Sequence, residues 1–229
     1  MPAPETLDDS RQPFGNLDES LVTNLIKVRR QEEKEQRRQS IIDAAEQLLA
    51  EKSWAETNFS EIAKLTRISR SLIYVYFPTR DDLYHAICNR SADVLRSLFT
   101  AALSSGGTGL DRLEAIGRAY HRFSREYPVY FGLHAEQEAG AGSGSRSFPY
   151  SHPAFSLFAQ ALAQGVADGS IKPPPGDLKT TAITLWTFTH GLLLIASRKG
   201  EFLRDRMDVE ASSVIDHGFS LLRGMLSAL

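Results

Sequence analysis

Residues 69–83, SRSLIYVYFPTRDDL, combine serine hydroxyls, two arginines and two tyrosines with a short apolar run. A guanidinium group pairs with phosphate or with O6 and N7 of guanine, so Arg70 and Arg80 could each serve such a contact. Tyrosine and serine hydroxyls are further donors to phosphate oxygens. No nucleophile in the chain lies at a spacing that pairs it with a general base. These side chains therefore favour recognition of a nucleic acid over catalysis.

Capping signals predict two short helices around this stretch. Asn58 and Glu61 have the spacing of a capping box, which begins a helix by satisfying free backbone N–H groups. Ser69 can cap a second helix, and Pro78 helps to end it because the residue before a proline is pushed out of the helical region. The short connection predicts a helix-turn-helix, and a further capping pair begins a third helix.

The second helix has an inner and an outer face. Ile73 and Phe77, at i and i+4, are expected to face the core. The side chains that then point outward are Arg70, Ser71, Tyr74 and Val75. An exposed face of this kind fits the major groove of DNA, where the start of a recognition helix meets base edges.

The stretch FSEIAKLTRISRSLIYVYFPTRDDL, residues 59–83, resembles the DNA-binding domain of the tetracycline-repressor (TetR) family of transcriptional regulators. In that family a tyrosine, a following tyrosine or histidine plus phenylalanine, and a basic residue after a short break recur. The match covers about residues 37–90. It implies an all-α fold, with an N-terminal three-helix DNA-binding domain that contains a helix-turn-helix and a larger C-terminal helical domain for ligand binding and dimerisation.

The resemblance also assigns roles to single residues. Tyr74, Tyr76 and Arg80 match phosphate contacts. Packing against a neighbouring helix is the alternative for the two tyrosines, and a merely solvated position at the start of a helix is the alternative for Arg80. The positions that face bases or the groove wall in the family are Ser60, Arg70, Ser71, Leu72 and Val75. Two departures from the pattern stand out. Arg67 holds the turn position usually taken by glycine, and Ser71 and Leu72 replace the commoner glycine and threonine, which predicts an unusual operator.

The whole chain has a helical rhythm, from which we predict three parts. Residues 1–33 are expected to form a disordered tail and a basic helical arm that leads toward phosphates, residues 34–94 the helix-turn-helix domain, and residues 95–229 the C-terminal domain. Later helices are expected at about 81–103, 110–127, 129–138, 153–167, 178–198 and 209–227, joined by glycine-rich or proline-rich connectors.

Aromatic side chains of the C-terminal part could line a small-molecule site, because aromatic walls with a few polar tips describe many such sites. The candidates for effector binding are Phe123, Tyr127, Phe131, His134, Trp186 and His190. The same residues would equally suit a packed core. The balanced charge of this part leaves the sign of a ligand's charge open.

The last two helices carry apolar stripes, and the resemblance implies that they form the interface of a homodimer. The candidate interface residues are Leu192, Ile195, Ile215, Phe219, Leu222 and Leu226. Packing within the core of one chain is the alternative for this stripe.

Composition excludes several classes of protein. The 229 residues, 42% of them apolar, suffice for a real core, and a single cysteine, Cys88, excludes an intrachain disulfide framework. The longest apolar stretch, residues 191–196, is too short to span a bilayer, and no signal peptide is evident, so we expect a cytoplasmic protein without a membrane partner. The histidines lack metal-binding spacing, so we expect no metal and no cofactor.

We therefore predict a ligand-responsive DNA-binding regulator: a homodimeric repressor that a small apolar or aromatic molecule releases from a palindromic double-stranded operator. One alternative is a DNA-binding regulator without such an inducer, either architectural or controlled by another protein. The other is a helical enzyme in which His121, Glu126 or His134 performs acid–base work.

Overall fold

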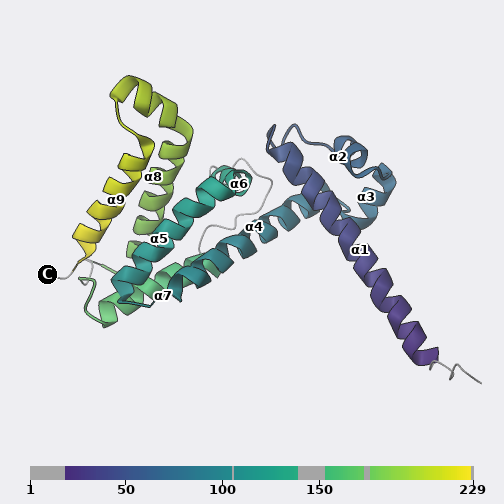
Figure 1. The fold of residues 1–229 in the computed structure, drawn as a ribbon, viewed down its shortest axis with the longest axis horizontal. Coiled ribbons are helices and arrows are strands. Elements are labelled where there is room, and N and C mark those ends of the chain that lie inside the picture. Colours follow the sequence, from purple (N-terminus) through teal and green to yellow (C-terminus); the bar gives the residue numbers. More distant parts are fainter. Residues whose placement is uncertain (1–18, 105, 139–152, 173–175, 228–229) are drawn as a thin grey trace, which may run out of the picture.

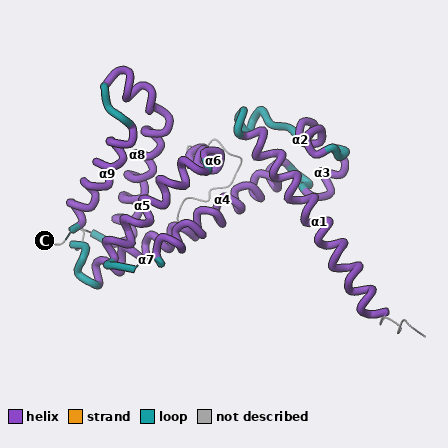
Figure 2. Tube along the Cα trace, viewed as in Figure 1, coloured by secondary structure: helices purple, strands orange, loops and turns teal. Residues whose placement is uncertain are grey.

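The computed structural model describes residues 19–104, 106–138, 153–172 and 176–227 (Figure 1). Helices α1 to α9 follow one another in the chain: Glu19–Leu49, Phe59–Thr66, Arg70–Tyr76, Arg80–Leu103, Gly109–Glu126, Pro128–Glu138, Pro153–Ala167, Leu178–Met207 and Ala211–Leu226. Over the described ranges the connections are short and no β-strand occurs (Figure 2). The predicted all-α fold is confirmed.

The predicted caps begin the helices of the helix-turn-helix. Asn58 Oδ1 accepts hydrogen bonds from the backbone N–H groups of Ser60 and Glu61 at the start of α2, at 3.0 and 3.2 Å. Ser69 Oγ accepts one from the backbone N–H of Leu72 at 3.2 Å, which begins α3. Because each cap satisfies backbone groups that a helix start leaves open, these two short helices have defined ends.

The turn between α2 and α3 has a left-handed residue where a glycine was expected. Arg67 adopts φ 56° and ψ 36° and closes α2, and the backbone N–H of Ile68 donates to the carbonyl of Ala63 at 3.1 Å. The usual turn is therefore kept despite the side chain, at a cost of roughly 1 kcal/mol for a left-handed residue with a Cβ.

One apolar core joins α1, α2, α3 and the start of α4. Ile73 and Phe77 of the α3 segment are 0% and 2% exposed, so the predicted inner face is confirmed. Their buried neighbours from the other helices are Ile41, Ile42, Ala45, Phe59, Ile62, Ala63, Leu83 and Ile87. This core fixes which face of α3 is turned inward.

Helix α4 connects this core to the C-terminal helices (Figure 1). Its first half contributes Leu83 and Ile87 to the first core, and its second half buries Leu95 and Phe99. The boundary predicted between residues 94 and 95 falls inside this helix and stays a prediction. Of the predicted N-terminal part, residues 1–18 lie outside the described residues, and the remainder forms the start of α1.

The C-terminal helices pack around α5 and α8. Helix α5 lies against α4, α7, α8 and α9, and α8 runs beside α9 (Figure 1). Helix α8 extends to Met207, beyond the expected end at residue 198, because a single glycine within a run of good helix formers costs only about 1 kcal/mol. The predicted connector at residues 139–147 lies outside the described residues.

Among the described helices, α8 alone is long and apolar enough to cross a membrane, judged by length and composition. The core helix of a globular domain passes the same test, and α8 packs against α5, α7 and α9. We therefore treat α8 as a core helix.

We expect Arg67→Gly to raise the free energy of unfolding, by up to about 1 kcal/mol, because glycine removes the left-handed strain while adding entropy to the unfolded chain. Chemical denaturation measures the change. Arg67→Ala is the control, since it removes the charge and keeps the Cβ, and it should bring no gain. A glycine variant no more stable than the alanine variant would contradict the assignment of strain to this turn.

Candidate functional site

The outer face of α3 is exposed as predicted. Tyr74 and Val75 are 46% and 70% exposed, and Arg70 and Ser71 are exposed as well. The predicted contacts Ser60, Leu72 and Tyr76 are half-buried. The structure therefore brings a cation, hydroxyl groups and apolar groups to one surface of a short helix.

Neighbouring side chains hold parts of this surface in place. The Tyr74 ring packs edge-on against Phe59, with ring centroids 5.1 Å apart. Ser71 Oγ lies 2.9 Å from Oγ of the cap residue Ser69. These contacts orient the phenol and the hydroxyl before any partner arrives, which lowers the entropy lost on binding.

Arg80 is held by a residue that the sequence analysis did not select. Its guanidinium donates to the Trp54 carbonyl at 2.5 Å and lies 5.0 Å from the centroid of the Trp54 ring. Arg80 is exposed, and its side chain forms no other hydrogen bond within the described ranges. Trp54 thus positions Arg80, and a tryptophan in the loop before α2 was the only signal in the sequence.

The predicted effector-site residues come together around Tyr120 of α5. The Tyr120 ring stacks on Trp186 at a centroid distance of 5.0 Å, and its hydroxyl lies 2.7 Å from His190 Nδ1. Phe131 lies 5.3 Å from His190. The remaining candidates, Phe123, Tyr127 and His134, form one chain of ring contacts with separations of 5.7 and 5.8 Å. A ligand entering this cluster would have to part the rings.

Polar groups of the cluster are few, and they are buried or half-buried. Burial, with a further effect of Arg198, lowers the pKa of His190 to about 4, so the imidazole is neutral at neutral pH. Nε2 of His134 lies 2.9 Å from Ser91 Oγ. Trp186 Nε1 is buried and has no hydrogen-bond partner within the described residues. A buried N–H of this kind costs free energy until an acceptor reaches it.

A separate small cleft of about 40 Å³, open at its mouth, lies between α5, α7, α8 and α9. Gly117 lets the Phe219 ring pack closely against α5 there, because a Cβ at this position would lie 2.8 Å from the ring. The lining is largely apolar: Leu110, Leu113, Glu114, Gly117, Phe158, Leu185, Thr189, Phe219, Leu222, Arg223 and Leu226. Sequence reasoning missed this cleft, since its lining comes from four separated helices.

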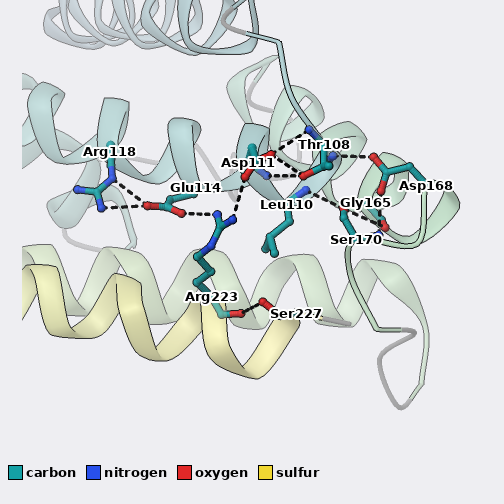
Figure 3. Close-up of polar contacts among 11 residues, drawn as sticks. Thr108, Leu110, Asp111, Glu114, Arg118, Gly165, Asp168, Ser170, Arg223 and Ser227 are labelled. Atoms are coloured by element: carbon teal, nitrogen blue, oxygen red, sulfur yellow. Dashed lines mark hydrogen bonds and ion pairs between the residues drawn. The ribbon is translucent and has the colours of Figure 1, made fainter. Parts of the chain in front are cut away.

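Ion pairs border the cleft (Figure 3). Arg223 donates to Glu114 Oε2 at 2.6 Å and to Asp111 Oδ1 at 2.9 Å, and Arg118 also donates to Glu114. Hydrogen bonds from Thr108, and then from Arg223, hold the pKa of Asp111 at about 2. Burial raises the pKa of Glu114, but Arg118 and Arg223 outweigh it, so that pKa lies below its ordinary value. Arg223 is thus neutralised within the chain.

Comparison with known families covers both parts of the chain. Residues 41–87 match the family of bacterial regulatory proteins called the tetR family, and residues 113–217 match the tetracyclin repressor-like C-terminal domain. The chain belongs to the TetR family. It is therefore a DNA-binding transcriptional regulator, and the alternative of a helical enzyme is set aside.

Solved structures with the TetR fold share little sequence with the chain. A protein of unknown function from Rhodococcus sp. RHA1 is 19% identical with a TM-score of 0.69, covering 84% of this chain and 96% of its own. The ketosteroid transcriptional regulator KstR2 of Mycobacterium tuberculosis is 17% identical with a TM-score of 0.60, covering 84% and 96%. A TetR-like regulator from the same Rhodococcus is 20% identical with a TM-score of 0.56, covering 82% and 95%. No curated protein matches the chain.

In this TetR-family chain a polar network ties three helices together where the two parts meet. Tyr130 of α6 donates to Glu46 Oε1 of α1 at 2.8 Å. Arg90 of α4 donates to Glu46 Oε2 at 2.9 Å, to Asp43 at 2.6 Å and to Gln39. Burial raises the pKa of Glu46 despite these partners. The Tyr130 ring stacks on Tyr127 and Phe123, so the network joins the aromatic cluster to the DNA-binding domain.

We expect the free energy of unfolding to decrease as the pH falls through a window set by His190. Its pKa is depressed in the fold, so between pH 6.5 and about 4 the unfolded chain binds a proton that the folded chain does not. The free energy of unfolding should fall by about 1.4 kcal/mol per pH unit at most over this window. His190→Gln should flatten this fall in denaturation curves taken at several pH values. His217→Gln, at an exposed position, is the control, and a His190→Gln curve parallel to the wild type would contradict the prediction.

Proposed function

We propose that this chain is a homodimeric repressor that binds a palindromic operator and that a small apolar or aromatic molecule releases from the DNA. The observation that carries the proposal is the outward face of α3, where Arg70 and Tyr74 project from a helix anchored by Ile73 and Phe77. As a DNA-binding regulator, the protein would act in the cytoplasm.

Each side chain of the outer face has a role in this proposal. Arg70 lies in the first turn of α3, the part of a recognition helix that meets base edges, and we assign it to O6 and N7 of a guanine. Val75 and Leu72 offer apolar contact to a thymine methyl group or the groove wall. Ser60 and Ser71 offer hydroxyls, while Tyr74, Tyr76 and Arg80 are proposed to bind phosphates. Tyr76 is half-buried and contributes its hydroxyl at most.

Dimerisation is proposed through the exposed faces of α8 and α9. Apolar side chains at helical spacing line these faces, with exposures of 43% to 63%: Phe188, Ile195, Leu221 and Met225. Of the predicted interface residues, Leu192, Leu222 and Leu226 are half-buried beside them. Ile215 and Phe219 are only 6% and 5% exposed, so they pack inside the chain and support the surface from behind. Two α3 helices about 34 Å apart would then meet successive major grooves.

The effector is proposed to bind in the C-terminal domain at the aromatic cluster. Its walls are rings from α5, α6 and α8, and the buried Nε1 of Trp186 needs an acceptor. We infer an apolar or aromatic molecule that carries a carbonyl or hydroxyl oxygen. A ketosteroid regulator among the similar structures supports an effector of this kind. A second candidate function is a DNA-binding regulator without a small-molecule inducer, either architectural or controlled by another protein. The close packing of the rings is the observation that favours it.

The network around Glu46 is proposed to couple the two sites. A ligand that parts the rings at Phe123 would move Tyr130, which donates to Glu46 on α1. Couplings between sites typically amount to about 1–3 kcal/mol, enough to change operator occupancy several-fold or more.

We expect enrichment of random duplex DNA on the purified protein to yield a palindromic motif with half-sites about one helical turn apart. Arg70→Ala should then relax the preference at one base pair per half-site, with a loss of about 1–3 kcal/mol at that position. Tyr74→Phe should weaken all sequences alike, because the ring still packs and only a phosphate donor is lost. An equal loss across a panel of base substitutions for Arg70→Ala would contradict its role as a base reader.

We expect Trp186→Phe to weaken effector binding about fivefold without changing operator affinity, since it keeps a ring and removes one N–H donor worth about 1 kcal/mol. The measurement is release of labelled operator by a panel of apolar carbonyl compounds. Trp54→Phe is the matched control at the chain's other tryptophan: it keeps the carbonyl and a ring for the contact with Arg80, and should leave the effector response unchanged. A Trp186→Phe variant released as readily as the wild type would remove Nε1 from the effector site.

A further inference from the structure

Helix α1 begins far from the core of its own domain. It starts at Glu19, whereas Ile41 is its first buried residue among those whose side chains are described. At 1.5 Å per residue the intervening segment is about 33 Å long. Residues 21–37 are all exposed, and Figure 1 shows this part of α1 extending away from the other helices. We name residues 19–40 the arm.

Basic side chains on the arm continue the core-facing stripe of α1. A helix repeats its face every 3.6 residues, so positions 18 apart, such as 27 and 45, point in the same direction. Steps of three and four residues link the members of this stripe: Lys27, Arg30, Lys34, Arg38, Ile41 and Ala45. Arg37 lies next to the stripe. In the last turns of α1 this face is apolar and packs on the helix-turn-helix. On the arm the same face is cationic.

This cationic face is not neutralised within the described residues. Arg29 pairs with Glu33 at 3.1 Å, and Arg38 lies 3.8 Å from Glu35. The other four cations of the arm form no ion pair within those residues and are exposed: Lys27, Arg30, Lys34 and Arg37. Acidic and amide side chains instead line a shallow groove elsewhere on the helix surface, formed by Glu32, Glu35, Gln36, Gln39, Ser40 and Asp43.

The cationic face lies on the same side of α1 as the recognition helix. The Arg38 guanidinium is 5.1 Å from the centroid of the Phe77 ring, and Phe77 directly follows α3. Tyr76, a proposed phosphate contact, is the preceding residue. Arg38 therefore lies at the edge of the surface that would meet DNA, and the cationic face extends outward from there to Lys27.

We propose that the arm binds the phosphate backbone of duplex DNA that flanks the sequence read by α3. The proposal rests on the proposed operator binding and adds a second contact region to it. From Ile41 to Lys27 the arm spans about 21 Å, which is the length of about six base pairs at 3.4 Å each. The contact carries charge and no base-specific group, so it raises affinity and salt dependence without changing the preferred sequence.

A membrane surface is the other macromolecule that such a helix could meet. Apolar side chains are exposed near the tip at Leu21, Val22, Leu25, Ile26 and Val28, and basic amphipathic helices bind anionic bilayers. DNA is favoured because this apolar group covers only about two turns, and because the cations face the side that holds α3.

The test compares two variants of the full chain that lose the same charge. The arm variant carries Lys27→Gln, Arg30→Gln, Lys34→Gln and Arg37→Gln. The control carries Arg198→Gln, Lys199→Gln, Arg204→Gln and Arg206→Gln, four exposed cations near the end of α8. Glutamine is a good helix former, so circular dichroism should show the arm retained.

Binding is measured on the enriched operator with short flanks of about 2 base pairs and long flanks of about 12, a length that exceeds the reach of the arm. We expect the wild type and the control to bind the long duplex at least tenfold more tightly than the short one. The arm variant should bind both equally. Its slope of log K against log salt on the long duplex should be smaller by about 0.9 per lost phosphate contact, up to about 3.6 per protomer.

The proposal would be overturned by an arm variant that still binds the long duplex more tightly than the short one and keeps the full salt slope. It would also be overturned if the wild type showed no preference for the long duplex and no added salt dependence. Binding of the wild type to phosphatidylserine-containing vesicles, lost in the arm variant and accompanied by no flank effect on DNA, would assign the arm to a membrane instead. If no operator is enriched, the proposed sequence reading fails. The arm is then tested by the salt slope of the two variants on one long random duplex.

Discussion

The burial of Ile73 and Phe77 against α1, α2 and α4 is the contact on which the reading surface depends. A helix of two turns has no independent stability in water, so α3 exists because its inner face is held. The same contact decides which side chains face outward, since a rotation of α3 by one residue would bury Tyr74 and expose Ile73. The proposed DNA-binding surface is therefore a product of core packing.

The polar contacts around this core fall into two groups with different physical roles. Caps such as Asn58 and Ser69 are local and define where helices begin. The contacts of Arg80 with Trp54 and of Tyr130 with Glu46 join residues far apart in the chain and fix how helices stand against one another. Disturbing a cap frays one helix, whereas disturbing a long-range contact moves one helix relative to another. The proposed coupling between effector and operator depends on contacts of the second kind.

Features of the fold that depend on residues close together in the chain could be predicted from the sequence. Spacing of capping residues located α2 and α3, and the i, i+4 pair Ile73 and Phe77 assigned the faces of α3. The contact of Tyr130 with Glu46, 84 residues apart, has no local signature. The apolar stripe of α9 is broad enough to cover both the side that packs inside the chain and the exposed side. The pattern alone did not show that Ile215 and Phe219 lie on the side that packs inside the chain. Trp54 was overlooked because a loop tryptophan has no periodicity.

Helix α4 contributes buried residues to both parts of the chain, so a tilt at one end of the helix displaces the other end. Phe99 is buried in the C-terminal part, and Arg80 stands at the other end, 19 residues away, at a distance of about 28 Å. A tilt of about 5° around Phe99 would carry the start of α4, and the helix-turn-helix attached to it, through about 2.5 Å. In a symmetric dimer the displacement occurs twice and in opposite directions. A small tilt of α4 imposed among the rings would thus become a change in the spacing of two recognition helices.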